Sequence, residues 1–173
     1  MYHITLITGG ARSGKSSFAL KLAEEKYNTR AFVATAAAMD NEMEVRISCH
    51  KKERGNKYLT YEEQINIVDT LRSLPENMEV AVIDCITVWM GNLFYKFNNS
   101  VNQIQEFINE FIDHISRPSC NLIFVTNEVG YGIIPENCTA RSFRDVAGST
   151  NSLIARKADS VYICFCGIPH QLK

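Results

Sequence analysis

Short runs of apolar residues alternate along the chain with longer segments in which apolar residues recur at helical spacing. The short runs are rich in β-branched residues and lack polar alternation, which is typical of strands that a parallel sheet buries on both faces. They predict strands over Tyr2–Thr8, Arg30–Thr35, Glu79–Asp84, Asn121–Thr126 and Ser160–Cys166.

The segments between these strands predict helices from their periodicity and their capping residues. An apolar stripe from Ile104 to Ile115 predicts a core-packing helix over Ser100–Ser116, whereas residues 86–97 favour no single element. Further helices are predicted over Ser16–Tyr27, from a cap at Asn41 with Glu44 to about Arg54, from a capping box of Thr60 and Glu63 to Leu74, and over Thr139–Ala158.

Strands that alternate with helices predict an α/β protein with a mostly parallel central sheet and helices on both of its faces. The length of 173 residues and the apolar content of 46% suit one compact domain, so residues 1–173 are expected to form a single domain. The sequence contains no internal repeat, low-complexity tract or linker.

The net charge and the cysteine content exclude some classes of function. The net charge of −1 provides no overall positive field for nucleic acid or an anionic membrane, so phosphate binding must be local. No apolar run approaches the roughly 18 residues that cross a bilayer, and the first run leads into a glycine-rich turn. We expect a soluble cytoplasmic protein with reduced thiols, in which Cys164 and Cys166 are small buried residues on one strand face rather than metal ligands.

The strongest chemical signal is the segment GGARSGKS over Gly9–Ser16. It matches the phosphate-binding pattern G-x-x-x-x-G-K-[ST] and lies between a predicted strand and a predicted helix, as this pattern requires. Its backbone N–H groups would surround phosphate oxygens at a helix N-terminus. Lys15 would reach the β- and γ-phosphates, and the hydroxyl of Ser16 would hold Mg²⁺. A chance glycine-rich turn is the alternative, which both flanking elements disfavour.

Asp84 ends an apolar strand, where a second carboxylate would position the metal ion or its water. A helix cap is an equally good explanation of Asp84 alone, but the phosphate loop favours the metal role. Thr35, between Ala34 and Ala36, marks a second strand end at which small residues let a nucleotide approach the backbone.

Arg46, His50 and Arg54 are spaced by four residues and therefore share one helix face. Two cationic neighbours favour a neutral imidazole, which can act as a nucleophile toward phosphorus. From the residues alone, a solvated basic face is the better explanation.

A further polar cluster follows the fourth predicted strand, and its arginines at a helix start could hold phosphate or lie at an ordinary surface. Its members are Asn127, Glu128, Arg141, Arg144 and Asp145.

Longer sequence blocks carry a resemblance to a known family. The segments ATA (34–36), DNEMEVRISCHKKER (40–54), VIDCITVWMGNL (82–93), TNEVGYGIIPEN (126–137) and ARSFRDVAG (140–148) follow the phosphate loop in order. Together they closely resemble the bifunctional adenosylcobinamide kinases/adenosylcobinamide-phosphate guanylyltransferases of cobalamin assembly, over effectively the whole chain. Two positions depart from the usual pattern: Cys49, where a second histidine is common, and Ser152, where a glutamine is common.

The resemblance implies a RecA-like P-loop scaffold with two activities. A nucleoside triphosphate, ATP or GTP, would phosphorylate the aminopropanol hydroxyl of adenosylcobinamide. His50 would then attack the α-phosphorus of GTP and pass GMP to adenosylcobinamide phosphate. The family also implies Mg²⁺ and a homo-oligomer, often a trimer.

The resemblance assigns the catalytic histidine to His50, whereas the phosphate loop and the strand end at Asp84 predict catalytic roles for Lys15 and Asp84 and a metal role for Ser16 and Asp84. The nucleotide-binding residues it implies are Gly9, Gly10, Ala11, Arg12, Ser13, Gly14, Lys15, Ser16, Ala34, Thr35, Ala36, Lys51, Lys52, Glu53, Arg54, Glu62 and Asp84. Two other functions stay open: a P-loop kinase for another small hydroxyl compound, without transferase activity, and a non-catalytic nucleotide-binding switch.

Overall fold

The structure, a computed structural model, describes residues 2–37, 45, 47–48, 51–52 and 54–173. A seven-stranded sheet runs through it in the order β3-β2-β4-β5-β1-β6-β7. All neighbouring strands are parallel except β6 and β7. The strands are β1 (Ile4–Gly9), β2 (Arg30–Ala34), β3 (Leu59–Glu62), β4 (Val80–Asp84), β5 (Asn121–Val125), β6 (Ser160–Phe165) and β7 (Ile168–Gln171).

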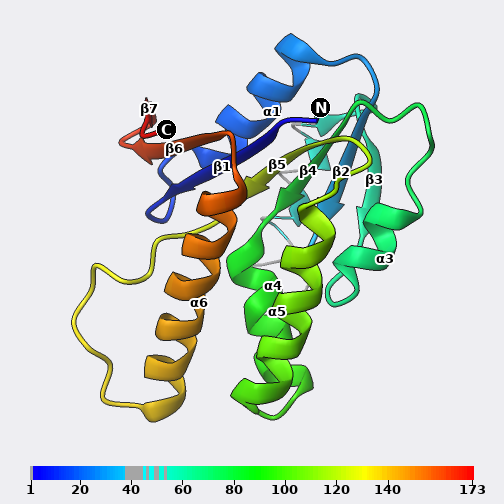
Figure 1. Cartoon of the computed structure of the whole chain (residues 1–173). Coiled ribbons are helices and arrows are strands. Elements are labelled where there is room, and N and C mark those ends of the chain that lie inside the picture. Colours follow the sequence, from blue (N-terminus) through cyan, green and yellow to red (C-terminus); the bar gives the residue numbers. More distant parts are fainter. Residues whose placement is uncertain (1, 38–44, 46, 49–50, 53) are drawn as a thin grey trace.

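Helices cover both faces of this sheet (Figure 1). On one face, α1 packs through Ala19, Leu20 and Ala23 against Ile7, Val82 and other strand residues. On the other face, α3 to α6 enclose a larger core. The helices are α1 (Lys15–Lys26), α3 (Ile67–Arg72), α4 (Ile86–Lys96), α5 (Val101–Ile115) and α6 (Cys138–Lys157).

The expected α/β class with a mostly parallel sheet is therefore confirmed. β5 lies between β1, which leads into the phosphate loop, and β4, which ends in Asp84. Within the part of the chain that the structure describes, no helix is both long and apolar enough to cross a membrane.

Two local expectations are wrong, and one strand was not predicted. Thr60 does not cap a helix, because it lies in β3, and the following helix begins only at Ile67. The C-terminal segment forms the antiparallel strand β7, which the sequence did not predict. Cys164 is buried as expected, but Cys166 is exposed in a turn at φ 50°, so the two thiols do not share a buried face.

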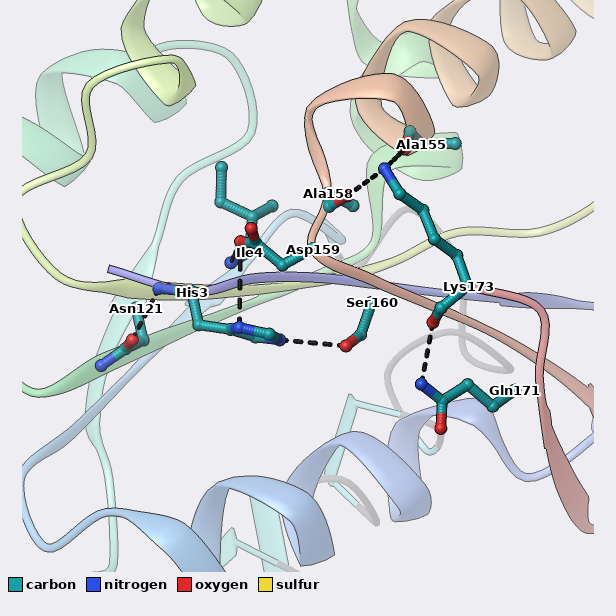
Figure 2. A network of polar contacts seen from close by, with 9 residues as sticks. All are labelled: His3, Ile4, Asn121, Ala155, Ala158, Asp159, Ser160, Gln171 and Lys173. Carbon is teal, nitrogen blue, oxygen red and sulfur yellow. Dashed lines mark hydrogen bonds and ion pairs between the residues drawn. The ribbon is translucent and has the colours of Figure 1, made fainter. Parts of the chain in front are cut away.

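At the edge where the parallel strands begin, side chains join neighbouring strands. Figure 2 shows that the ring of His3 lies toward Ser160 and that the carboxylate of Asp159 lies beside the backbone of Ile4. The Asp159 carboxylate accepts the Ile4 N–H at 2.8 Å, and the His3 ring contacts the Ser160 hydroxyl at 3.0 Å. The ammonium of Lys173 donates to the Ala158 carbonyl at 2.6 Å and thereby caps the C-terminus of α6.

Glu79 likewise joins neighbouring strands at this edge, in this case β2 and β4. Its carboxylate accepts the backbone N–H groups of Asn28 and Thr29, and its own N–H donates to the Thr29 hydroxyl at 3.1 Å. These hydrogen bonds, first that of Asn28 and then that of Thr29, lower the pKa of Glu79.

A pH-dependent contribution to stability follows from this lowered pKa. It is present above the ordinary Glu value of 4.5 and is lost as the pH falls through the lower value of the folded state. We expect Glu79→Gln to melt a few degrees below the wild-type protein at pH 7. The difference should narrow below pH 4.5, as measured by thermal unfolding across pH. Glu76→Gln, at an exposed neighbouring position, is the control, and a difference that is constant with pH would contradict the prediction.

Candidate active site

The ends of the parallel strands place three predicted nucleotide-binding residues in one row. Ala34 pairs with Glu62 on one side and with Asp84 on the other. Asp84 pairs in turn with Val125 of β5. Ligands of open α/β sheets bind beyond the carboxyl ends of the strands, so this row lies at the edge where a nucleotide is expected.

The phosphate loop leaves the same edge from the end of β1. Gly9 and Gly14 have positive φ values of 145° and 90°, which favour glycine. A Cβ atom on Gly9 would lie 2.4 Å from the carbonyl oxygen of Cys164, and one on Gly14 would lie 3.2 Å from Cα of Gly167. The loop is therefore held close to β6 and to the turn that follows it.

Lys15 concentrates positive charge at this loop. Its ammonium donates to the carbonyl of Gly10 at 2.5 Å and to the hydroxyl of Ser13 at 3.3 Å, so the side chain folds back across the loop. Gly14, the N-cap of α1, offers no side chain to cap the helix, which leaves backbone N–H groups directed toward the loop. A buried ammonium beside a helix N-terminus is suited to phosphate.

The end of β4 is fixed by Thr35, which is fully buried. The Thr35 hydroxyl accepts the Cys85 N–H at 2.7 Å and donates to the Cys85 carbonyl at 2.8 Å, and its own N–H donates to the carbonyl of Asp84 at 3.2 Å. Asn92 adds a hydrogen bond to the Thr35 carbonyl at 2.9 Å. Thr35 therefore holds the backbone that carries the Asp84 carboxylate, which is itself partly exposed.

Cys85 lies between Asp84 and α4, and its sulfur accepts the Val88 N–H at 3.4 Å. Burial, followed by the charge of Asp84, raises the pKa of this thiol to about 12. The charge of Lys15 acts on the same thiol in the opposite direction.

His50, Arg46 and Glu53 lie outside the described residues. Of their neighbours, the Lys51 ammonium lies 2.5 Å from the Glu62 carboxylate, and Lys52 is exposed. Arg54 is only 4% exposed, and its guanidinium carbon lies 3.9 Å from the centre of the Phe32 ring. A purely solvated basic face does not account for Arg54, because this side chain is packed against β2.

In the polar cluster that follows β5, it is Glu128 that contacts the phosphate loop. The Glu128 N–H donates to the Gly9 carbonyl at 3.1 Å. Arg141 donates to the Pro135 and Glu136 carbonyls at 2.9 and 2.6 Å. Arg144 lies 3.6 Å from the Asp145 carboxylate. The two arginines thus have local partners.

Sequence reasoning missed a buried polar network beneath the edge. The hydroxyls of Thr87 and Thr126 lie 3.1 Å apart, and Thr126 donates to the Asn151 side chain at 2.8 Å. Asn127 N–H donates to Thr87 at 2.7 Å, which fixes the backbone beyond β5. Short polar residues directly after an apolar strand were the available signal, but their partners lie far away in the sequence.

Similarity to known proteins extends along nearly the whole chain. The family model for cobinamide kinase / cobinamide phosphate guanyltransferase, CobU, matches residues 5–172. The chain belongs to this family. It is 32% identical to the bifunctional adenosylcobalamin biosynthesis protein CobU of Escherichia coli, over 97% of this chain and 98% of that protein.

Two further CobU-family relatives are similar over nearly their whole length. CobP of Pseudomonas aeruginosa is 34% identical, over 97% of this chain and 96% of that protein. CobU of Salmonella typhimurium is 35% identical, over 97% of this chain and 98% of that protein. Among solved structures, the RadB recombinase has a TM-score of 0.44 at 11% identity, over 93% of this chain and 73% of that chain.

The contact between Gly9 and β6 can be tested by adding one methyl group. Gly9→Ala forces strain of about 1–3 kcal/mol and a backbone clash, and should lower the melting temperature by roughly 2–10 °C. Gly10→Ala is the matched control, because its Cβ would meet nothing within 4 Å. Equal melting temperatures for the two variants, measured by calorimetry, would show that the Gly9 backbone tolerates a side chain.

The raised pKa of Cys85 predicts an unreactive thiol. Iodoacetamide at pH 8 should modify the exposed Cys138 and Cys166 and leave Cys85 unmodified until the protein is unfolded, since the thiolate is the reactive form. Peptide mapping by mass spectrometry measures each site separately. Modification of native Cys85 at the rate of Cys138 would contradict the burial described above.

Proposed function

We propose that this CobU-family protein phosphorylates the aminopropanol hydroxyl of adenosylcobinamide and then transfers GMP from GTP to the phosphate it has made. The observation that carries the proposal is the phosphate loop, in which Lys15 folds across Gly10 and Ser13. Family membership over residues 5–172 supports the substrate class. The single-domain organisation expected from the length is part of the same proposal.

In the kinase reaction, the loop N–H groups and Lys15 would hold the β- and γ-phosphates in place. The acceptor oxygen bonds to the γ-phosphorus as the bond from that phosphorus to the β-phosphate oxygen breaks. The acceptor proton passes to a carboxylate at this edge, Asp84 or Glu128. Glu128 already accepts the Gly130 N–H at 2.8 Å, which commits part of its hydrogen-bonding capacity to its own loop.

Magnesium suits the oxygen donors at this edge. Ser16 in the first turn of α1 and Asp84 at the end of β4 offer a hydroxyl and a carboxylate, which are ligands that Mg²⁺ accepts together with phosphate oxygens and water. Among the described residues, no cluster of three or more His, Cys, Asp or Glu residues could hold a metal ion by itself. When bound, Mg²⁺ would neutralise charge that develops on the phosphates.

In the transferase reaction, we assign the nucleophile to His50. Its ring nitrogen would bond to the α-phosphorus of GTP and release pyrophosphate, and a phosphate oxygen of adenosylcobinamide phosphate would then displace the histidine. Support comes from its sequence neighbour Lys51, which pairs with Glu62 in the row of strand ends described above. Lys51 and Lys52 would supply positive charge for the triphosphate, whereas Arg54 is packed on Phe32. Glu62 could accept hydrogen bonds from guanine or ribose.

We further propose that the protein acts in the cytoplasm as a homo-oligomer. The edge strand β7 and its neighbours expose Phe165, Ile168 and Leu172, with exposed fractions of 71%, 68% and 61%. An edge strand with exposed apolar residues is the kind of surface that a second chain covers.

A covalent intermediate provides the test. After incubation with GTP labelled at the α-phosphate, the protein should carry label that is stable to alkali and labile to acid, as expected of a bond between phosphorus and a histidine nitrogen. His50→Ala should abolish the label, whereas His170→Ala, at an exposed position of β7, should retain it. Intact-protein mass spectrometry measures the added GMP.

The same preparations separate the two other functions. Cobinamide phosphorylation without any GMP adduct on the wild-type protein would leave a P-loop kinase. Nucleotide binding with neither reaction would leave a nucleotide-binding switch. Either result would remove the transferase assignment of His50.

A further inference from the structure

The loop between β5 and α6 carries three apolar side chains that the protein leaves in solvent. Tyr131, Ile133 and Ile134 have exposed fractions of 85%, 96% and 68%. They belong to the segment Val129–Pro135, called the loop tip below, which contains no charged residue. Clustered exposed apolar residues mark a binding surface more often than isolated ones do.

The loop tip is held in place at its first end by the active site itself. The Glu128 N–H donates to the carbonyl of Gly9, and the Glu128 carboxylate accepts the Gly130 N–H at 2.8 Å. Two residues before Glu128, Thr126 is fully buried, and its hydroxyl is hydrogen-bonded to the hydroxyl of Thr87.

The other end of the loop tip is held by α6. Arg141 donates to the carbonyls of Pro135 and Glu136, and the Asn137 side chain caps the helix by accepting the Ala140 N–H at 3.0 Å. Figure 1 shows the segment as a wide arc beside α6 that starts where β5 ends. Exposed apolar residues on a loop fixed at both ends are presented outward, whereas residues of a free chain could collapse onto the core.

The chemistry of the two ligands separates their binding surfaces. The nucleotide is suited to the cations and backbone N–H groups of Gly9–Ser16. The acceptor must bring its hydroxyl to the terminal phosphate at this loop, so its bulk must lie beside it. That bulk is a corrin macrocycle with apolar faces and amide side chains, for which uncharged apolar residues and a tyrosine hydroxyl are suitable contacts.

We propose that the loop tip binds the corrin macrocycle of the acceptor, with Tyr131, Ile133 and Ile134 as specificity-determining contacts. This inference rests on the proposed function. The attachment of the loop to Gly9 ties the corrin surface to the phosphate loop through one hydrogen bond, so both acceptors, adenosylcobinamide and its phosphate, meet the same surface. A second copy of the chain is the competing occupant and is an outcome of the test.

The test compares Tyr131→Ser, Ile133→Ser and Ile134→Ser with the wild-type protein in steady-state kinetics of both reactions. Each variant should raise KM for adenosylcobinamide and for adenosylcobinamide phosphate by roughly 10-fold, the effect of losing one buried apolar contact. The KM for GTP and the melting temperature should stay unchanged. Tyr95→Ser, which removes an 81% exposed tyrosine at the end of α4, is the matched control and should change neither KM.

Three results would overturn the inference. One is a KM for the corrinoid acceptors that is unchanged in all three variants, although the wild-type protein converts these acceptors. Another is a rise in KM for GTP equal to that for the corrinoid, which would place the loop tip on the nucleotide. The third is dissociation of an oligomer in the same variants, measured by analytical ultracentrifugation, which would make the loop tip an interface between copies. Absence of any corrinoid turnover by the wild-type protein would instead refute the proposed function.

Discussion

The close approach of Gly9 to the carbonyl oxygen of Cys164 is the constraint on which the rest of the site depends. A side chain at this position would meet that oxygen at 2.4 Å, so β1 can end beside β6 only as glycine. The same residue accepts the Glu128 N–H, and the loop that it opens contacts the turn at Gly167. The phosphate loop is therefore joined to the β5–α6 loop at Gly9 and to the β6–β7 turn at Ser13 and Gly14. Contacts with distant segments of the chain therefore hold the predicted phosphate loop in place.

Buried polar side chains form a second set of constraints on the site. Thr35 uses both hydrogen-bonding capacities of its hydroxyl on Cys85, and Thr126 contacts Thr87 and Asn151. Buried polar groups that are fully paired specify one arrangement of the backbone, because any other would leave them unsatisfied. At this edge of the sheet they fix where β2, β4 and β5 end. The carboxylate of Asp84 can therefore stay partly exposed while its backbone is held.

The sequence predicts most of this architecture, and the exceptions have physical reasons. The strands that are buried on both faces can be predicted from the sequence because their apolar runs are continuous. In contrast, β3 has the exposed, mixed sequence LTYE, in which Thr60 imitates a helix cap, and β7 contains a proline and is exposed throughout. The phosphate loop was predicted from spacing, since its function is local. The packing of Arg54 on Phe32 and the bond between Glu128 and Gly9 join residues distant in the sequence, so only the folded chain reveals them.

The turn between β6 and β7 differs from ordinary surface hairpins. Gly167 is exposed, yet its N–H donates to the Ser13 carbonyl at 3.1 Å and its backbone lies against Gly14. A surface hairpin ordinarily tolerates sequence variation, because few other residues pack on it. Here the hairpin packs against Ser13 and Gly14 of the predicted phosphate loop. Gly167 has a φ of 82°, a conformation that other residues rarely adopt, so this exposed turn and the predicted phosphate loop behind it share one backbone constraint.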